Sequence, residues 1–167
     1  MKSVTPLFLF LMFICSNSYS QLSSDKIFES FKQGERTNCS SIAFIKASLN
    51  VYGLDNLFET EKIDDNQQKI TLKNNATFNL KSEELDRAKV SAGFVFIKDN
   101  CDSEKITDYA VLTYAVMAKY KQIIDREDTF DKALEDLEDG TVYTPTIYKY
   151  LGFKLGKQIE KLNRQQG

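Results

Sequence analysis

A long run of side chains at helical spacing places the strongest constraint on the fold of this chain. Between Ser103 and Arg126, apolar residues recur every three or four positions, which gives a helix one continuous apolar face. The stripe consists of Ile106, Tyr109, Ala110, Leu112, Thr113, Val116, Met117, Tyr120, Ile123 and Ile124. This pattern predicts the strongest helix of the chain.

Shorter patterns predict further helices. A helix from Cys39 to about Tyr52 is apolar around most of its circumference, which predicts that it is buried, and Gly53 suits its end. Ser23 or Ser24 can cap a short helix that runs through Phe31. The remaining helices are predicted at 82–92, 130–139 and 145–151, and in the basic tail at 154–166.

Residues 67–81 follow a different pattern. Ile70 and Leu72 alternate with polar neighbours, as do Phe78 and Leu80, and the residues between these pairs favour a turn. We therefore expect a β-hairpin here, and either a strand or a packed loop at 93–99. Together these elements predict one α+β domain, rich in helix, with a small antiparallel sheet.

The first twenty residues have the pattern of a signal peptide. Lys2 precedes an apolar stretch from Pro6 to Cys15, and Ser18 and Ser20 supply the small residues of a cleavage site before Gln21. We expect export to the periplasm or the cell exterior, with residues 1–20 removed and 21–167 forming the single domain. Nothing else in the sequence predicts a membrane span.

Charge and composition narrow the function classes. Without Lys2 the chain has 21 basic and 24 acidic residues, mixed along its length, so nothing predicts a nucleic-acid partner. No phosphate-binding loop is present, and the absence of histidine argues against zinc, so we expect neither a cofactor nor a metal. The acidic residues at 125–139 lack the order of a calcium loop and are expected to be a solvated helix face. A protein or peptide is the partner that remains, and the oligomeric state is left open.

Cys39 and Cys101 are the two cysteines that remain after the signal peptide. In an oxidising compartment they form either a disulfide or two free thiols. The disulfide would close a loop of about 62 residues and stabilise the fold by roughly 4 kcal/mol. The sequence leaves both alternatives open.

Cys39 also stands where a cysteine nucleophile is often placed. A thiol at the start of a helix lies near the positive end of the helix dipole, which favours the thiolate, and near backbone N–H groups that can bind an oxyanion. Gln33 lies six residues upstream, where its amide could be a second oxyanion donor.

The segment QGERTNCSSIAFIKA, which begins at Gln33, resembles the region around the nucleophile of papain-like and calpain-like cysteine peptidases. The resemblance implies that Gln33 is the oxyanion donor, that Cys39 is the nucleophile and that the fold is peptidase-like. It covers 15–20 residues, and the chain departs from the family at Ser40, where the family has an aromatic residue.

The absence of histidine removes the usual base of such a cysteine. One hypothesis is therefore a non-catalytic, exported domain, a degenerate papain-like fold that binds a protein or peptide. The alternative is a cysteine-dependent hydrolase or transferase that uses Cys39 with a carboxylate, a lysine or a partner's histidine as base.

Overall fold

A computed structural model describes residues 23–97, 100–139, 142 and 144–154. The predicted signal peptide and the tail beyond Lys154 lie outside the described residues. The elements in chain order are α1 (Ser24–Phe28), β1 (Phe31–Lys32), α2 (Cys39–Tyr52), β2 (Phe58–Lys62), β3 (Gln67–Leu72), β4 (Thr77–Lys81), α3 (Ser82–Ala92), β5 (Val95–Phe96), α4 (Cys101–Asp125), α5 (Phe130–Glu138) and the 3₁₀ helix η1 (Thr144–Leu151). The predicted helix-rich α+β fold with a small antiparallel sheet is confirmed.

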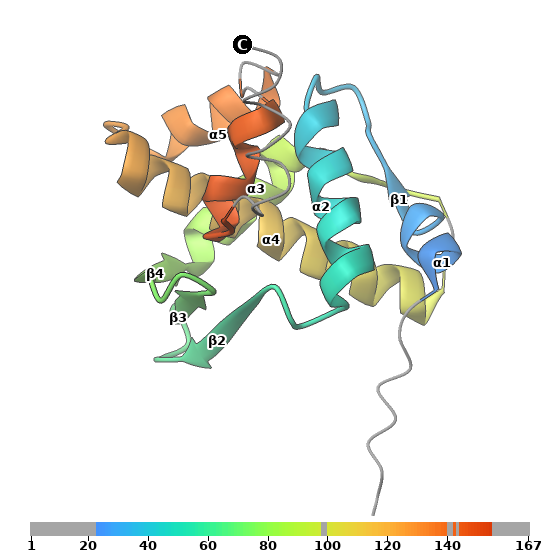
Figure 1. The fold of residues 1–167 in the computed structure, drawn as a ribbon, viewed down its shortest axis with the longest axis horizontal. Coiled ribbons are helices and arrows are strands. Elements are labelled where there is room, and N and C mark those ends of the chain that lie inside the picture. The colour runs from blue at the N-terminus through green and yellow to red at the C-terminus, as the bar shows by residue number, and fades with distance from the viewer. Residues whose placement is uncertain (1–22, 98–99, 140–141, 143, 155–167) are drawn as a thin grey trace, which may run out of the picture.

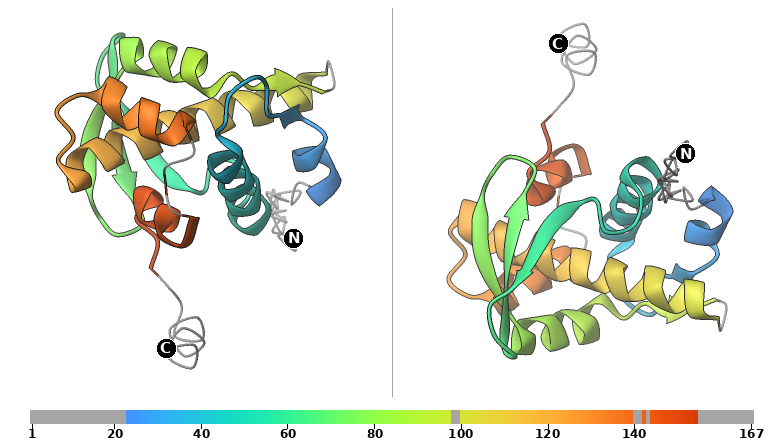
Figure 2. Two further views of the ribbon diagram at one scale, coloured as in Figure 1. Left: turned by 90° about the horizontal axis from the view of Figure 1, so that it is seen from above. Right: turned by 90° about the horizontal axis from the view of Figure 1, so that it is seen from below.

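Helix α4 is the axis around which the other elements pack (Figures 1 and 2). Helices α1 and α2 contact its N-terminal half, while α3, α5 and η1 surround its C-terminal half. Tyr114 and Met117, near its middle, are fully buried. The helix begins at Cys101, two residues before the predicted start, because the side chain of Asn100 accepts a hydrogen bond from the Ser103 amide at 2.9 Å.

The predicted hairpin is the β3–β4 pair of a three-stranded antiparallel sheet in the order β2-β3-β4. Ile70 lies opposite Phe78, and Asn75 adopts φ 66° in the predicted turn. Strand β2 was not predicted, because only Phe58 is buried and the four residues after it are all exposed. An exposed edge strand of this kind has no apolar alternation that a sequence pattern can detect.

A two-stranded ribbon, β1–β5, corrects the prediction for Phe31. Helix α1 ends at Phe28 rather than continuing, and Phe31 pairs with Phe96 in the ribbon. The Phe31 ring is fully buried and stacks on Phe94 at 4.9 Å, a contact that the predicted helix could not supply. Within the predicted range 93–99, Val95 and Phe96 form a strand, β5, which is one of the two predicted alternatives, and residues 98–99 lie outside the described residues.

Helix α2 is not buried all round, contrary to the prediction. It turns Ala43, Ala47 and Val51 to solvent, and Val51 is 67% exposed. The polar Lys46 is buried instead, because its ammonium group donates hydrogen bonds to the carbonyls of Phe28 (2.9 Å) and Phe31. Those carbonyls lie where α1 ends and β1 begins, and the lysine satisfies them.

Among the described residues, no helix combines the length and the apolar character that crossing a membrane requires.

Candidate functional site

The start of α2, which carries Cys39, is fastened to the end of α5. The Thr37 hydroxyl donates to the Glu138 carbonyl at 2.7 Å, and the Ser41 hydroxyl donates to the Leu137 carbonyl at 3.4 Å. The negative end of the α5 dipole therefore faces the positive end of the α2 dipole. The last carbonyls of α5 thus lie beside the helix start that carries Cys39.

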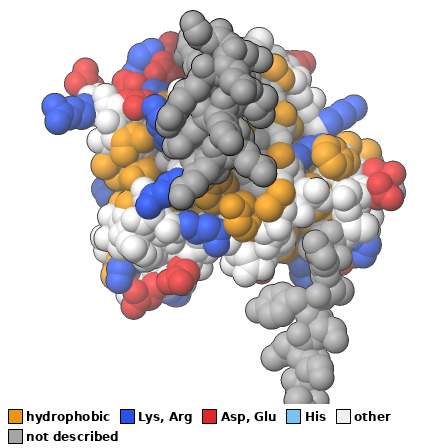
Figure 3. Space-filling model, in the orientation of Figure 1, with side chains coloured by type: hydrophobic (Ala, Val, Ile, Leu, Met, Phe, Trp, Pro, Cys, Tyr) orange, Lys and Arg blue, Asp and Glu red, His pale blue; other side chains and the backbone are white. Residues whose placement is uncertain are grey.

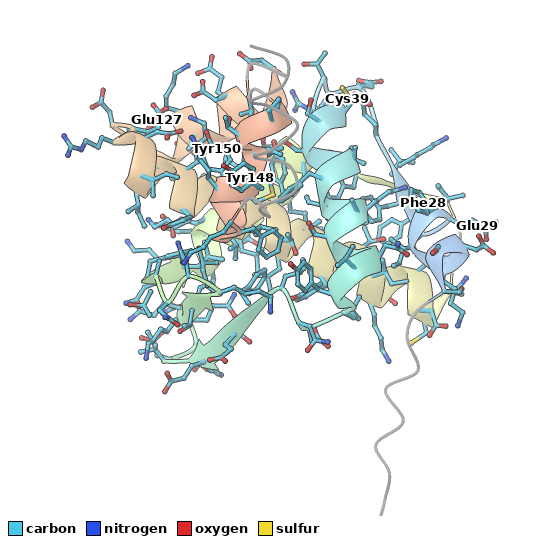
Figure 4. The ribbon with its side chains drawn as sticks, viewed as in Figure 1. Phe28, Glu29, Cys39, Glu127, Tyr148 and Tyr150 are labelled. Carbon is cyan, nitrogen blue, oxygen red and sulfur yellow. The ribbon has the colours of Figure 1, made fainter. Side chains whose placement is uncertain are left out.

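Cys39 itself is exposed at the first turn of α2, at the periphery of the molecule (Figure 4). The Gln33 side-chain amide donates to the carbonyl of Arg36, within its own loop. Among the described residues, no hydrogen bond joins Gln33 to Cys39, and none involves the thiol. Gly34, between them, is needed for packing, because a Cβ there would lie 2.5 Å from the Gly93 carbonyl oxygen.

Cys39 and Cys101 are both free and exposed, so the structure adopts the free-thiol alternative. Each is the first residue of a helix, Cys39 of α2 and Cys101 of α4.

Asn38 occupies the N-cap position of α2 without capping it. Its side chain turns into the core, where Nδ2 donates to the Ala92 carbonyl at 2.8 Å and Oδ1 has no hydrogen-bond partner. The Tyr114 hydroxyl, also buried, faces Asn38 and Ser91 without a hydrogen bond of normal geometry. Burial raises the pKa of Tyr114 to about 12, which keeps the phenol neutral. The side chains of Asn38 and Tyr114 thus lie in the protein interior, whereas Cys39, which follows Asn38, is exposed.

The acidic residues at 125–139 are not one solvated face, contrary to the prediction. Three of their carboxylates converge on the ammonium group of Lys121, at 3.3 Å from Asp125, 2.7 Å from Glu127 and 2.8 Å from Asp136. Lys121 is only 4% exposed. Burial alone would lower its pKa, but the hydrogen bonds to Asp136 and Glu127 outweigh burial and raise the pKa above its ordinary value.

This Lys121 cluster joins three elements rather than holding a ligand. Asp125 also accepts a hydrogen bond at 2.8 Å from the hydroxyl of Tyr150, a residue of η1 that is labelled in Figure 4. Asp136 belongs to α5. In the part of the chain that the structure describes, no group of three or more cysteines or carboxylates is placed to hold a metal ion.

The feature best suited to binding is a groove between α3 and α5, which lie side by side along α4 (Figure 2). Its volume is about 450 Å³, within the usual range for ligand sites. One helical stripe from each helix lines it, together with one residue of the Cys39 loop. The lining residues are Arg36, Asp86, Arg87, Val90, Ser91, Asp131, Leu134, Glu135 and Glu138.

Two polar bridges cross the groove between its helices. Arg87 pairs with Asp131 at 3.2 Å, and the Ser91 hydroxyl donates to Glu138 at 3.1 Å. The groove also contains Val90, which is 71% exposed, and Leu134, which is buried. Val90 could have been noticed in the sequence as an apolar residue outside the buried stripe of its helix, but the groove itself depends on the packing of α5.

A second exposed apolar surface lies at the opposite end of α4. Phe28, Val95, Phe96 and Ile97 are each between 42% and 53% exposed. On the face of the molecule shown in Figure 3, acidic and basic side chains are interspersed.

Comparison with known proteins gives no match: no family model fits the chain, and neither a curated protein nor a solved structure is significantly similar to it.

Proposed function

We propose that this chain is an exported, non-catalytic domain that binds a segment of a protein or peptide in the groove between α3 and α5. The observation that carries the proposal is Val90. It remains 71% exposed inside a concave surface of about 450 Å³, where a partner's side chain would bury it.

Three features of the Cys39 region support a non-catalytic role. The chain has no histidine, and the Gln33 amide donates its hydrogen bond within its own loop. The negative C-terminal end of α5 lies at the positive N-terminal end of α2. A cysteine hydrolase needs a base within hydrogen-bond reach of its nucleophile. A papain-like ancestry stays a hypothesis that rests on the spacing of Gln33 and Cys39.

The hydrolase or transferase alternative retains one supporting observation, the exposure of the Cys39 thiol at a helix start. Rapid alkylation of Cys39 at pH 6, far faster than that of Cys101, would favour it. Equal and slow alkylation of both thiols would favour the binding domain.

The binding proposal is tested by selecting a displayed library of random peptides against the purified protein. We expect the selected peptides to bind with micromolar affinity and to lose binding to the Val90→Asp variant. Val51→Asp, on the exposed face of α2, is the matched control because Val51 is 67% exposed and lies outside the groove. Peptides that bind both variants and the wild type equally would place the binding surface elsewhere and contradict the proposal.

A further inference from the structure

The groove between α3 and α5 contains more negative than positive charge. Its walls carry four carboxylates, Asp86, Asp131, Glu135 and Glu138, against the two guanidinium groups of Arg36 and Arg87. The excess of two negative charges lies around the apolar centre formed by Val90 and Leu134.

Both arginines are already engaged. Arg36 binds one oxygen of Glu138, whose other oxygen accepts the Ser91 hydrogen bond. Arg87 pairs with Asp131, and its guanidinium carbon lies 5.5 Å from the centre of the Phe130 ring. Because these contacts fix the arginines at the bridges, neither is available to neutralise the other two carboxylates.

Asp86 and Glu135, one on each wall, are the two carboxylates that the arginines of the groove do not neutralise. Asp86 forms no ion pair among the described residues. Within the described part of the chain, Glu135 forms its one ion pair with Lys132, at 3.1 Å, and Lys132 also pairs with Asp136 at 3.0 Å. A partner that covered the groove would remove water from these carboxylates, which costs free energy unless the partner supplies a cation.

From this charge pattern, and resting on the function proposed above, we infer that the partner segment is amphipathic and basic. An apolar side chain of the partner covers Val90 and Leu134, and lysines or arginines beside it pair with Asp86 and Glu135. The same charges disfavour nucleic acids and anionic membrane surfaces, because both present negative charge to the groove.

The test measures the fluorescence polarisation of three labelled peptides of equal length. The first alternates leucine with lysine, the second replaces each lysine by glutamate, and the third replaces each leucine by serine. At low salt we expect the first peptide to bind about tenfold more tightly than either of the others, and its advantage over the acidic peptide to shrink as salt is raised.

A charge-reversed protein sharpens the test. Asp86→Lys combined with Glu135→Lys should invert the preference, so that the acidic peptide binds more tightly than the basic one. The control variant combines Glu59→Lys with Glu104→Lys, two exposed positions outside the groove with the same change in net charge, and should keep the original order.

The outcomes separate this inference from the binding function itself. If leucine peptides of both signs bind equally and both lose binding to Val90→Asp, the groove is a binding site but its preference for basic segments is wrong. If binding of the basic peptide is unaffected by Val90→Asp and by the charge reversal, both proposals fail. If the serine peptide binds as well as the leucine peptide, the apolar contact is wrong and the inference falls.

Discussion

Lys121 carries its charge in the interior of the protein, and its three carboxylate partners explain why it can. Replacing it with methionine keeps the length of the side chain but removes the cation that Asp125, Glu127 and Asp136 share. We expect Lys121→Met to lower the free energy of unfolding by about 2–3 kcal/mol, measured by urea denaturation.

Lys132→Met is the control for this prediction. Lys132 also pairs with Asp136, but its side chain is 48% exposed, so its removal should cost well under about 1 kcal/mol. Equal losses of unfolding free energy in Lys121→Met and Lys132→Met would mean that the Lys121 cluster stabilises the fold no more than a surface ion pair does.

Acid should weaken the same cluster. Burial alone would raise the pKa of Asp136, but the hydrogen bonds from Lys121 and Lys132 outweigh burial and hold the pKa below its ordinary value. A carboxyl whose pKa is depressed by folding stabilises the fold above its unfolded pKa, and this stabilisation is lost as pH falls through the folded pKa. The difference in unfolding free energy between wild type and Lys121→Met should therefore be largest near pH 6 and decrease below about pH 4. A gap that stays constant from pH 6 to pH 3 would contradict this origin.

The two thiols give a direct chemical prediction. Because Cys39 and Cys101 are free and exposed, both should react with iodoacetamide in the folded protein without a reductant. Mass spectrometry of the chain from Gln21 should then show two adducts, one at each residue. Labelling that required a reductant would show that the disulfide forms instead.

At the scale of single elements, helices with a clear local signal were predicted well. The start of α5 at Phe130 and the ends of α2 at Tyr52 and α3 at Ala92 agree with the predicted ranges, because they depend on local capping by Thr129, Gly53 and Gly93. The buried face of α2 was predicted wrongly, because its burial depends on which side α1 and α4 cover. The binding groove was harder to predict than any single helix. It requires α3 and α5 to lie side by side although about 40 residues separate them.

The end of α1 offers a matched pair of substitutions. The sequence predicted one helix through both Phe28 and Phe31, whereas in the structure Phe28 is 53% exposed and Phe31 is fully buried in the ribbon. We expect Phe31→Ala to cost about 3–5 kcal/mol in unfolding free energy and Phe28→Ala about 1 kcal/mol or less. Similar costs for both would support one continuous helix through Phe31.

At the scale of the whole molecule, the packing around α4 predicts which parts of the protein unfold first and which unfold last. Residues 109–118 of α4 are all buried except Leu112, and α4 contacts five other helical elements as well as β4 and β5. Their amides should therefore exchange only when the whole domain unfolds. In α1, by contrast, Ile27 is the single buried residue, and the β1–β5 ribbon is only two residues long on each strand.

Hydrogen exchange under native conditions tests this order directly. The slowest amides in 109–118 should report an opening free energy equal to that of global unfolding in urea, while those of α1, β1 and β5 should exchange through smaller openings at much lower free energy. Because Lys46 connects α2 to the carbonyls of Phe28 and Phe31, Lys46→Ala should accelerate exchange in α1 and the ribbon more than in α4. If amide exchange in α4 and in the ribbon were accelerated to the same extent, the ribbon would unfold together with the core. The expectation that the ribbon opens separately would then be wrong.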